Sequence, residues 1–168
     1  MNRQRGFTLI ELMITLAIAA ILLTVGVPSF QSMMRNNRAA THMNEMITAL
    51  NLARSEAAKR GLRVSLCPST NQAACTGGTS WNNGWIVFID TSTNDSSVIV
   101  GTVLRVGEAL AGAPTFTGPP SVRYRFTGGT LPDGTSVQFD YALDTVTQRV
   151  CVSPVGRPRV EKVATSCP

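Results

Sequence analysis

The chain has 168 residues, of which 43% are hydrophobic and 6% aromatic, and it carries a formal net charge of +5 at pH 7. This length allows one domain with a core of its own beyond an N-terminal apolar segment, and so mild a basic excess does not by itself indicate a nucleic-acid-binding protein. With a single histidine and no G-x-S-x-G, P-loop or H-E-x-x-H motif, the sequence offers no catalytic constellation, so we predict a protein that is not an enzyme and holds no metal or cofactor.

Residues 7–27 form an almost uninterrupted apolar run that contains one acid, Glu11. As a helix the run is roughly 32 Å long, enough to cross the hydrocarbon core of a membrane. A cleaved signal peptide has a shorter apolar run, and a lipoprotein leader needs a cysteine, but none precedes Cys67. A plain membrane anchor fits the length but leaves Glu11 unexplained, at a cost of about 2.5–3.5 kcal/mol.

The string GFTLIE at residues 6–11 resembles the processing site of type IV pilins and type II secretion pseudopilins. The resemblance implies that a prepilin peptidase cuts after Gly6, removes residues 1–6 and methylates the new N-terminal Phe7. It also implies that Glu11 pairs with the N-terminal amine of a neighbouring subunit, which offsets the cost of two buried charges. An acid that only reaches the membrane interface is the alternative.

The segment after Pro28 has the pattern of an amphipathic helix. Pro28 is expected to kink or end a helix. The apolar stripe recurs at a spacing near 3.6 residues and comprises Phe30, Met33, Met34, Ala40, Met43, Ile47, Leu50, Ala53 and Ala57. The basic pair at 59–60 and then Gly61 are typical of a helix C-terminus. We therefore predict one helix over about 7–60, kinked near Pro28 and about 80 Å long.

After Gly61 the hydrophobic period changes from 3.6 to 2, which indicates strands. We expect strands at 63–67, 84–90, 97–106, 121–126, 136–142 and 147–152, separated by Gly, Pro, Asn and Asp turn signals. In the fourth, the alternation places Phe126 on the core face and Arg123 on the solvated face. Strands without intervening helices predict an antiparallel sheet, and the long helix laid on it gives an α+β fold.

The four cysteines, Cys67, Cys75, Cys151 and Cys167, follow an export-type N-terminus, and their even number predicts disulfides. Three pairings are possible, and closeness in sequence favours Cys67–Cys75 and Cys151–Cys167. A zinc site is disfavoured because there is no C-x₂-C spacing and only one histidine.

A second motif, C…W-x-x-G-W-I-V-F-x-D, comprises Cys75, Trp81, residues 84–88 and Asp90. Together with the string ARSEA at residues 53–57, it resembles the GspH/FimT branch of minor pilins and minor pseudopilins. The resemblance implies a type IV pilin-like fold, with a long N-terminal helix packed on an antiparallel β-sheet head.

The string GRPR at residues 156–159 resembles the Gly-Arg-x-Arg motif of FimT-type minor pilins, which bind extracellular DNA. In an extended stretch Arg157 and Arg159 lie on one side and can meet successive phosphates. Arg149 and Lys162 add positive charge, while Glu161 and Asp144 dilute it. The resemblance therefore implies weak, sequence-independent binding of double-stranded DNA through Gly156, Arg157, Arg159, Lys162 and Arg149. A solvated turn whose arginines pair with local acids is the alternative.

The expected organisation is a leader at 1–6, a membrane and filament-core helix at 7–28, and a head at 29–168 that is β-rich from 61. We expect a single-pass inner-membrane protein with its head in the periplasm, which later enters the extracellular type IV pilus of a Gram-negative bacterium. Three functions remain open: a DNA receptor in natural transformation, a structural minor pilin that primes pilus assembly, and a type II secretion pseudopilin. In each case other major and minor pilins and the prepilin peptidase are the implied partners.

Overall fold

The computed structural model describes residues 7–95, 97–131, 135–161 and 167. The predicted leader with Gly6, and the predicted DNA contact Lys162, lie outside these residues. The chain divides into two compact units, Met1–Asn37 and Arg38–Pro168. One helix, α1 (Leu9–Arg60), contributes to both.

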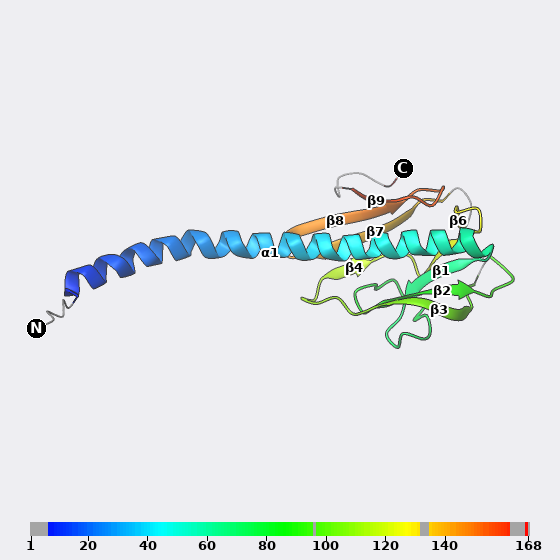
Figure 1. Ribbon diagram of the computed structural model, residues 1–168, viewed down its shortest axis with the longest axis horizontal. Helices are drawn as coiled ribbons and strands as arrows, with labels where there is room; N and C mark the ends of the chain where they lie inside the picture. Colours follow the sequence, from blue (N-terminus) through cyan, green and yellow to red (C-terminus); the bar gives the residue numbers. More distant parts are fainter. Residues whose placement is uncertain (1–6, 96, 132–134, 162–166, 168) are drawn as a thin grey trace, which may run out of the picture. The chain divides into compact units, whose positions relative to one another are not determined.

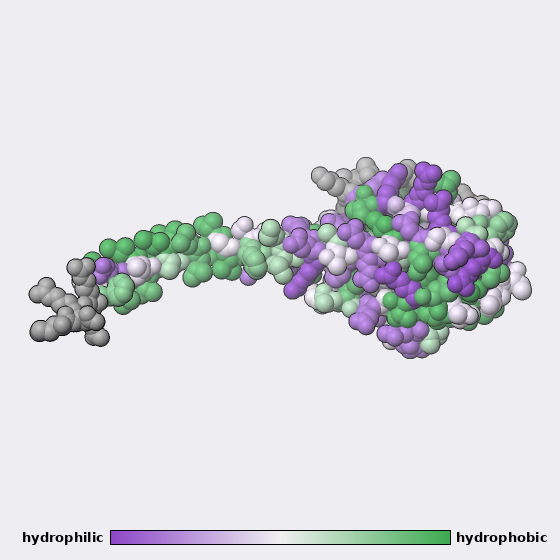
Figure 2. Space-filling model, in the orientation of Figure 1, coloured by the Kyte–Doolittle hydropathy of each residue, from purple (hydrophilic) through white to green (hydrophobic). Residues whose placement is uncertain are grey.

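In the first unit the described side chains, at residues 7–37, are exposed apart from a partly buried Arg35. The helix continues through Pro28, so the proline does not end it. α1 is long and apolar enough to span a membrane by length and composition, and none of its most apolar window is buried within the protein. Figure 2 shows this part of the helix as an almost continuous hydrophobic surface.

The second unit contains two antiparallel sheets rather than the one that the sequence predicts (Figure 1). Sheet A has the strand order β3-β2-β1-β5-β6, and sheet B the order β4-β7-β8-β9. The strands of sheet A are β1 (Val64–Pro68), β2 (Trp85–Asp90), β3 (Val100–Gly107), β5 (Val122–Tyr124) and β6 (Thr130–Leu131). Those of sheet B are β4 (Thr115–Thr117), β7 (Val137–Leu143), β8 (Val146–Val152) and β9 (Pro158–Glu161).

Six of these strands overlap the predicted ones, and β4, β6 and β9 were not predicted. The first two are only three and two residues long, too short to show a period of 2. β9 begins with a proline, which normally argues against a strand. Pro158 is tolerated because it is the first residue of an edge strand, where its missing N–H costs no ladder hydrogen bond.

The core of the second unit joins the C-terminal part of α1 to both sheets. The helix contributes Ala39, Met43, Met46, Ala49, Leu50, Ala53 and Ala57. The predicted stripe is therefore right from Met43 onward but wrong at its start, since Ala40 is exposed and Ala39 is buried. Phe30, Met33 and Met34 belong to the first unit and are also exposed. Periodicity alone could not show where the tertiary contacts of the helix begin.

The alternation in the predicted strand 121–126 is also misleading at two positions. Arg123 is buried, and its guanidinium bonds the Asp90 carboxylate at 3.0 Å. Phe126 is 60% exposed because β5 ends at Tyr124 and the chain turns there. Burial by itself raises the pKa of Asp90, but hydrogen bonds from the Ile99 and Ser92 amides outweigh it and hold that pKa below its ordinary value.

Candidate functional site

The predicted assembly residue Glu11 forms a capping box at the start of α1. Its Oε2 accepts hydrogen bonds from the Thr8 amide and the Thr8 hydroxyl, both at 3.0 Å. In return the Glu11 amide donates to the Thr8 hydroxyl oxygen at 3.3 Å. The pattern T-x-x-E before an apolar run is the sequence signature of this capping box. The Glu11 carboxylate therefore satisfies the Thr8 amide just before α1, and its pairing with a neighbouring subunit stays a prediction.

The GRPR string forms the turn between β8 and β9 and the first residues of β9. The Gly156 amide donates to the Ser153 carbonyl at 2.7 Å, and the Ser153 amide donates to the Arg157 carbonyl at 3.0 Å. Gly156 adopts a φ of +79°, which a residue with a Cβ rarely takes. We call residues 153–157 the arginine turn.

The arginine turn packs against the turn between β5 and β6, residues 125–129. The Thr130 amide donates to the Pro154 carbonyl at 3.2 Å. A Cβ placed on Gly156 would collide with the carbonyl oxygen of Gly128 and lie 2.9 Å from Cε1 of Tyr124. Figure 1 shows the tip of the β8–β9 hairpin beside β6 and near the C-terminal end of α1. The glycine of the motif is thus required for backbone packing, which fixes the position of Arg157.

The predicted DNA-contacting arginines differ in how far their charge is already neutralised. The Arg157 side chain is exposed and makes no ion pair or hydrogen bond within the described part of the chain. Arg159 pairs with Glu161 at 2.6 Å, with half of its side chain exposed. Arg149 pairs with Asp140 at 2.6 Å and is only 13% exposed. The alternative of arginines paired with local acids therefore applies to Arg149 and Arg159, but not to Arg157.

Strand register explains these pairings. Arg149 lies opposite Asp140 of β7 on one side and opposite Glu161 of β9 on the other. Directly opposed residues in an antiparallel sheet share a face, so opposite charges meet there. Arg159 lies two residues before Glu161 on the same strand and hence on the same face. The sequence contains all four residues, but their register across three strands is not readable from it.

Both favoured disulfides are present in the structure. Cys67 bonds Cys75 across the end of β1, and Cys151 of β8 bonds Cys167, with 16 residues of sequence separation. The second bond links the chain after β9 to Cys151 of β8, which only one residue separates from the arginine turn. Across the described residues, no group of three or more His, Cys, Asp or Glu side chains could hold a metal ion.

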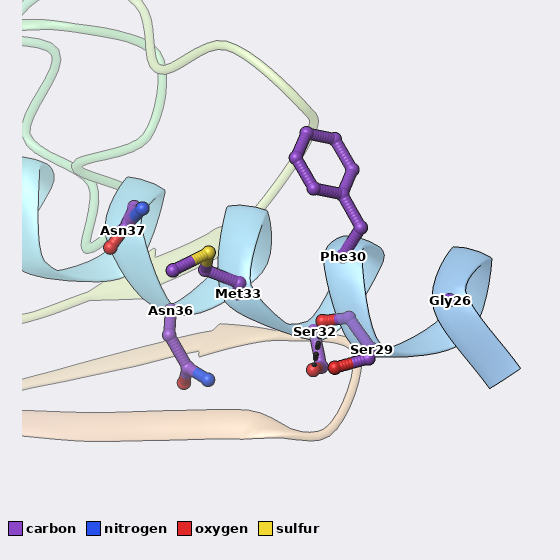
Figure 3. Close-up of a pocket in the computed structure, with 7 residues that line it drawn as sticks. All are labelled: Gly26, Ser29, Phe30, Ser32, Met33, Asn36 and Asn37. Atoms are coloured by element: carbon purple, nitrogen blue, oxygen red, sulfur yellow. Dashed lines mark hydrogen bonds between the residues drawn. The ribbon is translucent and has the colours of Figure 1, made fainter.

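A groove of about 610 Å³ lies along α1 in the first unit (Figure 3). Its lining is Gly26, Ser29, Phe30, Ser32, Met33, Asn36 and Asn37. The Ser32 hydroxyl donates to the Ser29 carbonyl at 2.7 Å, and the Phe30 ring points away from the helix. Because the lining has no titratable side chain, the groove offers no group for acid–base chemistry.

Two protein families match this sequence. The prokaryotic N-terminal methylation motif matches residues 1–27, and the family described as type II transport protein GspH matches residues 42–156. The second match covers more than half of the chain. The chain belongs to the GspH family.

This GspH-family chain is also similar to type IV pilins in sequence. It is 32% identical over 117 residues to a type IV major alpha-pilin of Moraxella bovis, covering 70% of this chain and 69% of that protein. It is 54% identical over 35 residues to the prepilin peptidase-dependent protein D of Escherichia coli, a match that covers 21% of this chain. That second match spans only about a quarter (24%) of the Escherichia coli protein.

Solved structures support the same fold. The type IV minor pilin FimU of Pseudomonas aeruginosa superposes with a TM-score of 0.62 at 16% identity, covering 79% of this chain and 95% of FimU. The minor pseudopilin EpsH of the Vibrio cholerae type 2 secretion system superposes with a TM-score of 0.52 at 11% identity, covering 76% of this chain and 99% of EpsH. The prediction of a pilin-like α+β fold is confirmed.

Proposed function

We propose that this chain is a minor pilin of the FimT kind, which binds extracellular double-stranded DNA through the arginine turn during natural transformation. The observation that carries the proposal is Arg157, an exposed guanidinium without an acid partner in the described part of the chain. A phosphate can therefore bind it without first displacing a carboxylate. Because the turn is held by packing at Gly156, little backbone conformational entropy is lost when it binds.

The other predicted contacts contribute less. Arg159 has to exchange Glu161 for a phosphate, and Arg149 is both paired and largely buried. Lys162 remains a prediction from the sequence. Few phosphate contacts imply weak binding per subunit with a shallow salt dependence. A hairpin tip that contacts phosphates does not read base edges, so we expect no sequence preference.

The N-terminal segment serves membrane anchoring and assembly in this proposal. Residues 7–28 hold the protein in the inner membrane of a Gram-negative bacterium, with the head in the periplasm, until it enters the filament. Before that, the prepilin peptidase cuts after Gly6 and methylates Phe7. Glu11 then binds the amine of a neighbouring pilin as the subunit enters the filament. Its Oε1 is available for this contact, because both hydrogen bonds from Thr8 go to Oε2.

Two substitutions of Glu11 separate helix capping from the ion pair. Glu11→Gln keeps a side-chain oxygen for the capping box but removes the charge, whereas Glu11→Ala removes both. If the ion pair drives assembly, both variants fail to enter sheared pili. Normal incorporation of Glu11→Gln would contradict the charge pairing and leave only the capping role.

The DNA-binding proposal is tested with the full chain in detergent micelles and a short random-sequence duplex. Arg157→Gln should weaken binding the most, Arg159→Gln less and Arg149→Gln the least. The matched control is Arg105→Gln, which makes the same charge change on β3, at the opposite end of sheet A from β5 and β6. If Arg157→Gln binds DNA as well as Arg105→Gln does, the assignment to this turn is wrong.

The likeness to EpsH and the GspH family match favour one alternative, a minor pseudopilin of type II secretion. A structural minor pilin that primes pilus assembly is the other. Deletion of the gene separates the three functions. Lost transformation with normal pili supports the DNA receptor, lost pili support the priming role, and a secretion defect supports the pseudopilin.

A further inference from the structure

A polar groove lies beside the arginine turn in the second unit. It has a volume of about 360 Å³ and is lined by Asn51, Arg54, Ser55 and Ala58 of α1 and by Thr127 and Gly128 of the β5–β6 turn. The lining carries a guanidinium, an amide and two hydroxyl groups, and no acidic side chain. These are hydrogen-bond donors of the kind that bind phosphate oxygens.

Arg54 is held at this groove by one of its three nitrogens. Its Nε donates to the Gly128 carbonyl at 3.1 Å. Its two terminal amino groups make no hydrogen bond or ion pair with the residues that the structure describes. The guanidinium is therefore fixed in place while most of its donors remain available.

The same carbonyl connects the groove to the arginine turn. The Gly128 oxygen accepts the bond from Arg54, and it is also the atom closest to the position of a Cβ on Gly156. Arg157 follows Gly156 directly in the chain. Arg54 and the arginine turn thus contact one backbone oxygen, which places two guanidinium-bearing segments next to each other although they are about 100 residues apart in sequence.

We propose that this groove is a second phosphate-binding site, which binds the DNA backbone next to the phosphate bound by Arg157. Arg54 donates from its terminal amino groups, and Asn51 and Thr127 add neutral donors from the two walls. The inference rests on the proposed DNA-binding function and extends the contact from one turn to a surface on α1. Phosphates follow every 3.4 Å of helix axis along each strand, so adjacent cations can bind neighbouring phosphates of one duplex.

The test must distinguish a phosphate contact from a purely structural role of Arg54 (a brace), since its hydrogen bond to Gly128 also holds the β5–β6 turn against α1. Asn51→Asp places a negative charge in the groove without removing the bond from Arg54 to Gly128. Asn44→Asp is its matched control, because it makes the same change on the same helix at an exposed position seven residues earlier. That is roughly 10 Å away along the axis, beyond one Debye length at physiological salt.

Binding of a short duplex by the full chain in detergent micelles is measured over a range of salt concentrations for Arg54→Gln, Asn51→Asp, Asn44→Asp and Arg157→Gln. We expect Arg54→Gln and Asn51→Asp to weaken binding about three- to tenfold, Arg54→Gln to lower the slope of log affinity against log salt by about 0.9, and Asn44→Asp to change little. If Asn51→Asp binds like Asn44→Asp, Arg54 is only a brace and the second site is wrong. If Arg157→Gln alone weakens binding, the proposed function stands without the groove. If no variant weakens binding, the proposed function itself fails.

Discussion

Replacing Gly156 with alanine tests whether the glycine of the GRPR string is a packing residue. The substitution introduces a Cβ at a φ of +79°, which costs about 1–2 kcal/mol for a residue other than glycine. The new Cβ also collides with the Gly128 carbonyl oxygen, so the two turns must separate. Separation stretches the 3.2 Å hydrogen bond from Thr130 to Pro154, which is worth about 0.5–1.5 kcal/mol. We expect a total loss of about 1.5–3.5 kcal/mol in the free energy of unfolding.

Two other glycines separate these contributions. Gly77 has a φ of +73° but nothing within 4 Å of an added Cβ, so Gly77→Ala should show the backbone cost alone. Gly129 lies in the neighbouring turn, and a Cβ there comes no closer than 3.4 Å to the Pro154 oxygen, so Gly129→Ala should cost the least. Urea unfolding of the full chain in detergent, followed by the fluorescence of Trp81 and Trp85, gives the three values, since both tryptophans are buried.

The order of the three losses in unfolding free energy shows whether Gly156 is a packing residue. Gly156→Ala should destabilise more than Gly77→Ala, and Gly77→Ala more than Gly129→Ala. If Gly156→Ala and Gly77→Ala lose the same free energy, the contact with Gly128 carries no energy and the packing argument is refuted.

Three further predictions concern the second unit. Asp90→Asn should lower the free energy of unfolding by about 3–5 kcal/mol, because it leaves Arg123 buried without a charged partner. The parent should lose stability as the pH falls below 3.8, through the lowered pKa of Asp90, and the variant should not show this loss. Equal acid sensitivity of parent and variant would contradict this prediction. Replacing Cys151 and Cys167 together by serine should lower the free energy of urea unfolding by about 3 kcal/mol, because the disulfide closes a loop with a sequence separation of 16. An unchanged unfolding midpoint would show that this disulfide does not contribute to stability. Burial lowers the pKa of His42 below 6.5, so the unfolded chain binds the imidazole proton more tightly and the free energy of unfolding should fall as the pH drops through 6.5 towards the folded pKa. His42→Gln should flatten that part of the curve of stability against pH. If the variant keeps the slope of the parent, the pH dependence does not come from His42.

Several features could be predicted because they depend on residues close together in the chain. The end of α1 at Arg60 follows from a basic pair, which interacts favourably with the last carbonyl groups of the helix, and from the glycine after it, which ends the helix. The two disulfides join cysteines that are close in sequence. The GFTLIE string identifies the N-terminal methylation motif without any tertiary information.

Other features depend on contacts between distant segments, and there the sequence misled. Arg123 alternates with core residues, a pattern that predicts a solvent-exposed side chain. It is nevertheless buried, because its guanidinium donates to the carboxylate of Asp90, 33 residues earlier, inside the protein. The single predicted sheet is two sheets, because strand order is decided by which faces can be buried against α1 rather than by the alternation within each strand.

The class of the protein therefore follows from local sequence patterns, which indicate a long N-terminal helix with an acid near its start, followed by a β-rich head with two short disulfide loops. Which groups of the GRPR region are available to a ligand depends on contacts between strands and turns that are distant in sequence. Arg149 and Arg159 meet acids because strand register brings Asp140 and Glu161 beside them, whereas Arg157 lies in the turn before β9, outside that register. Gly156, which reads as part of a binding motif, is a packing residue because a backbone carbonyl from another hairpin occupies the space of its missing side chain.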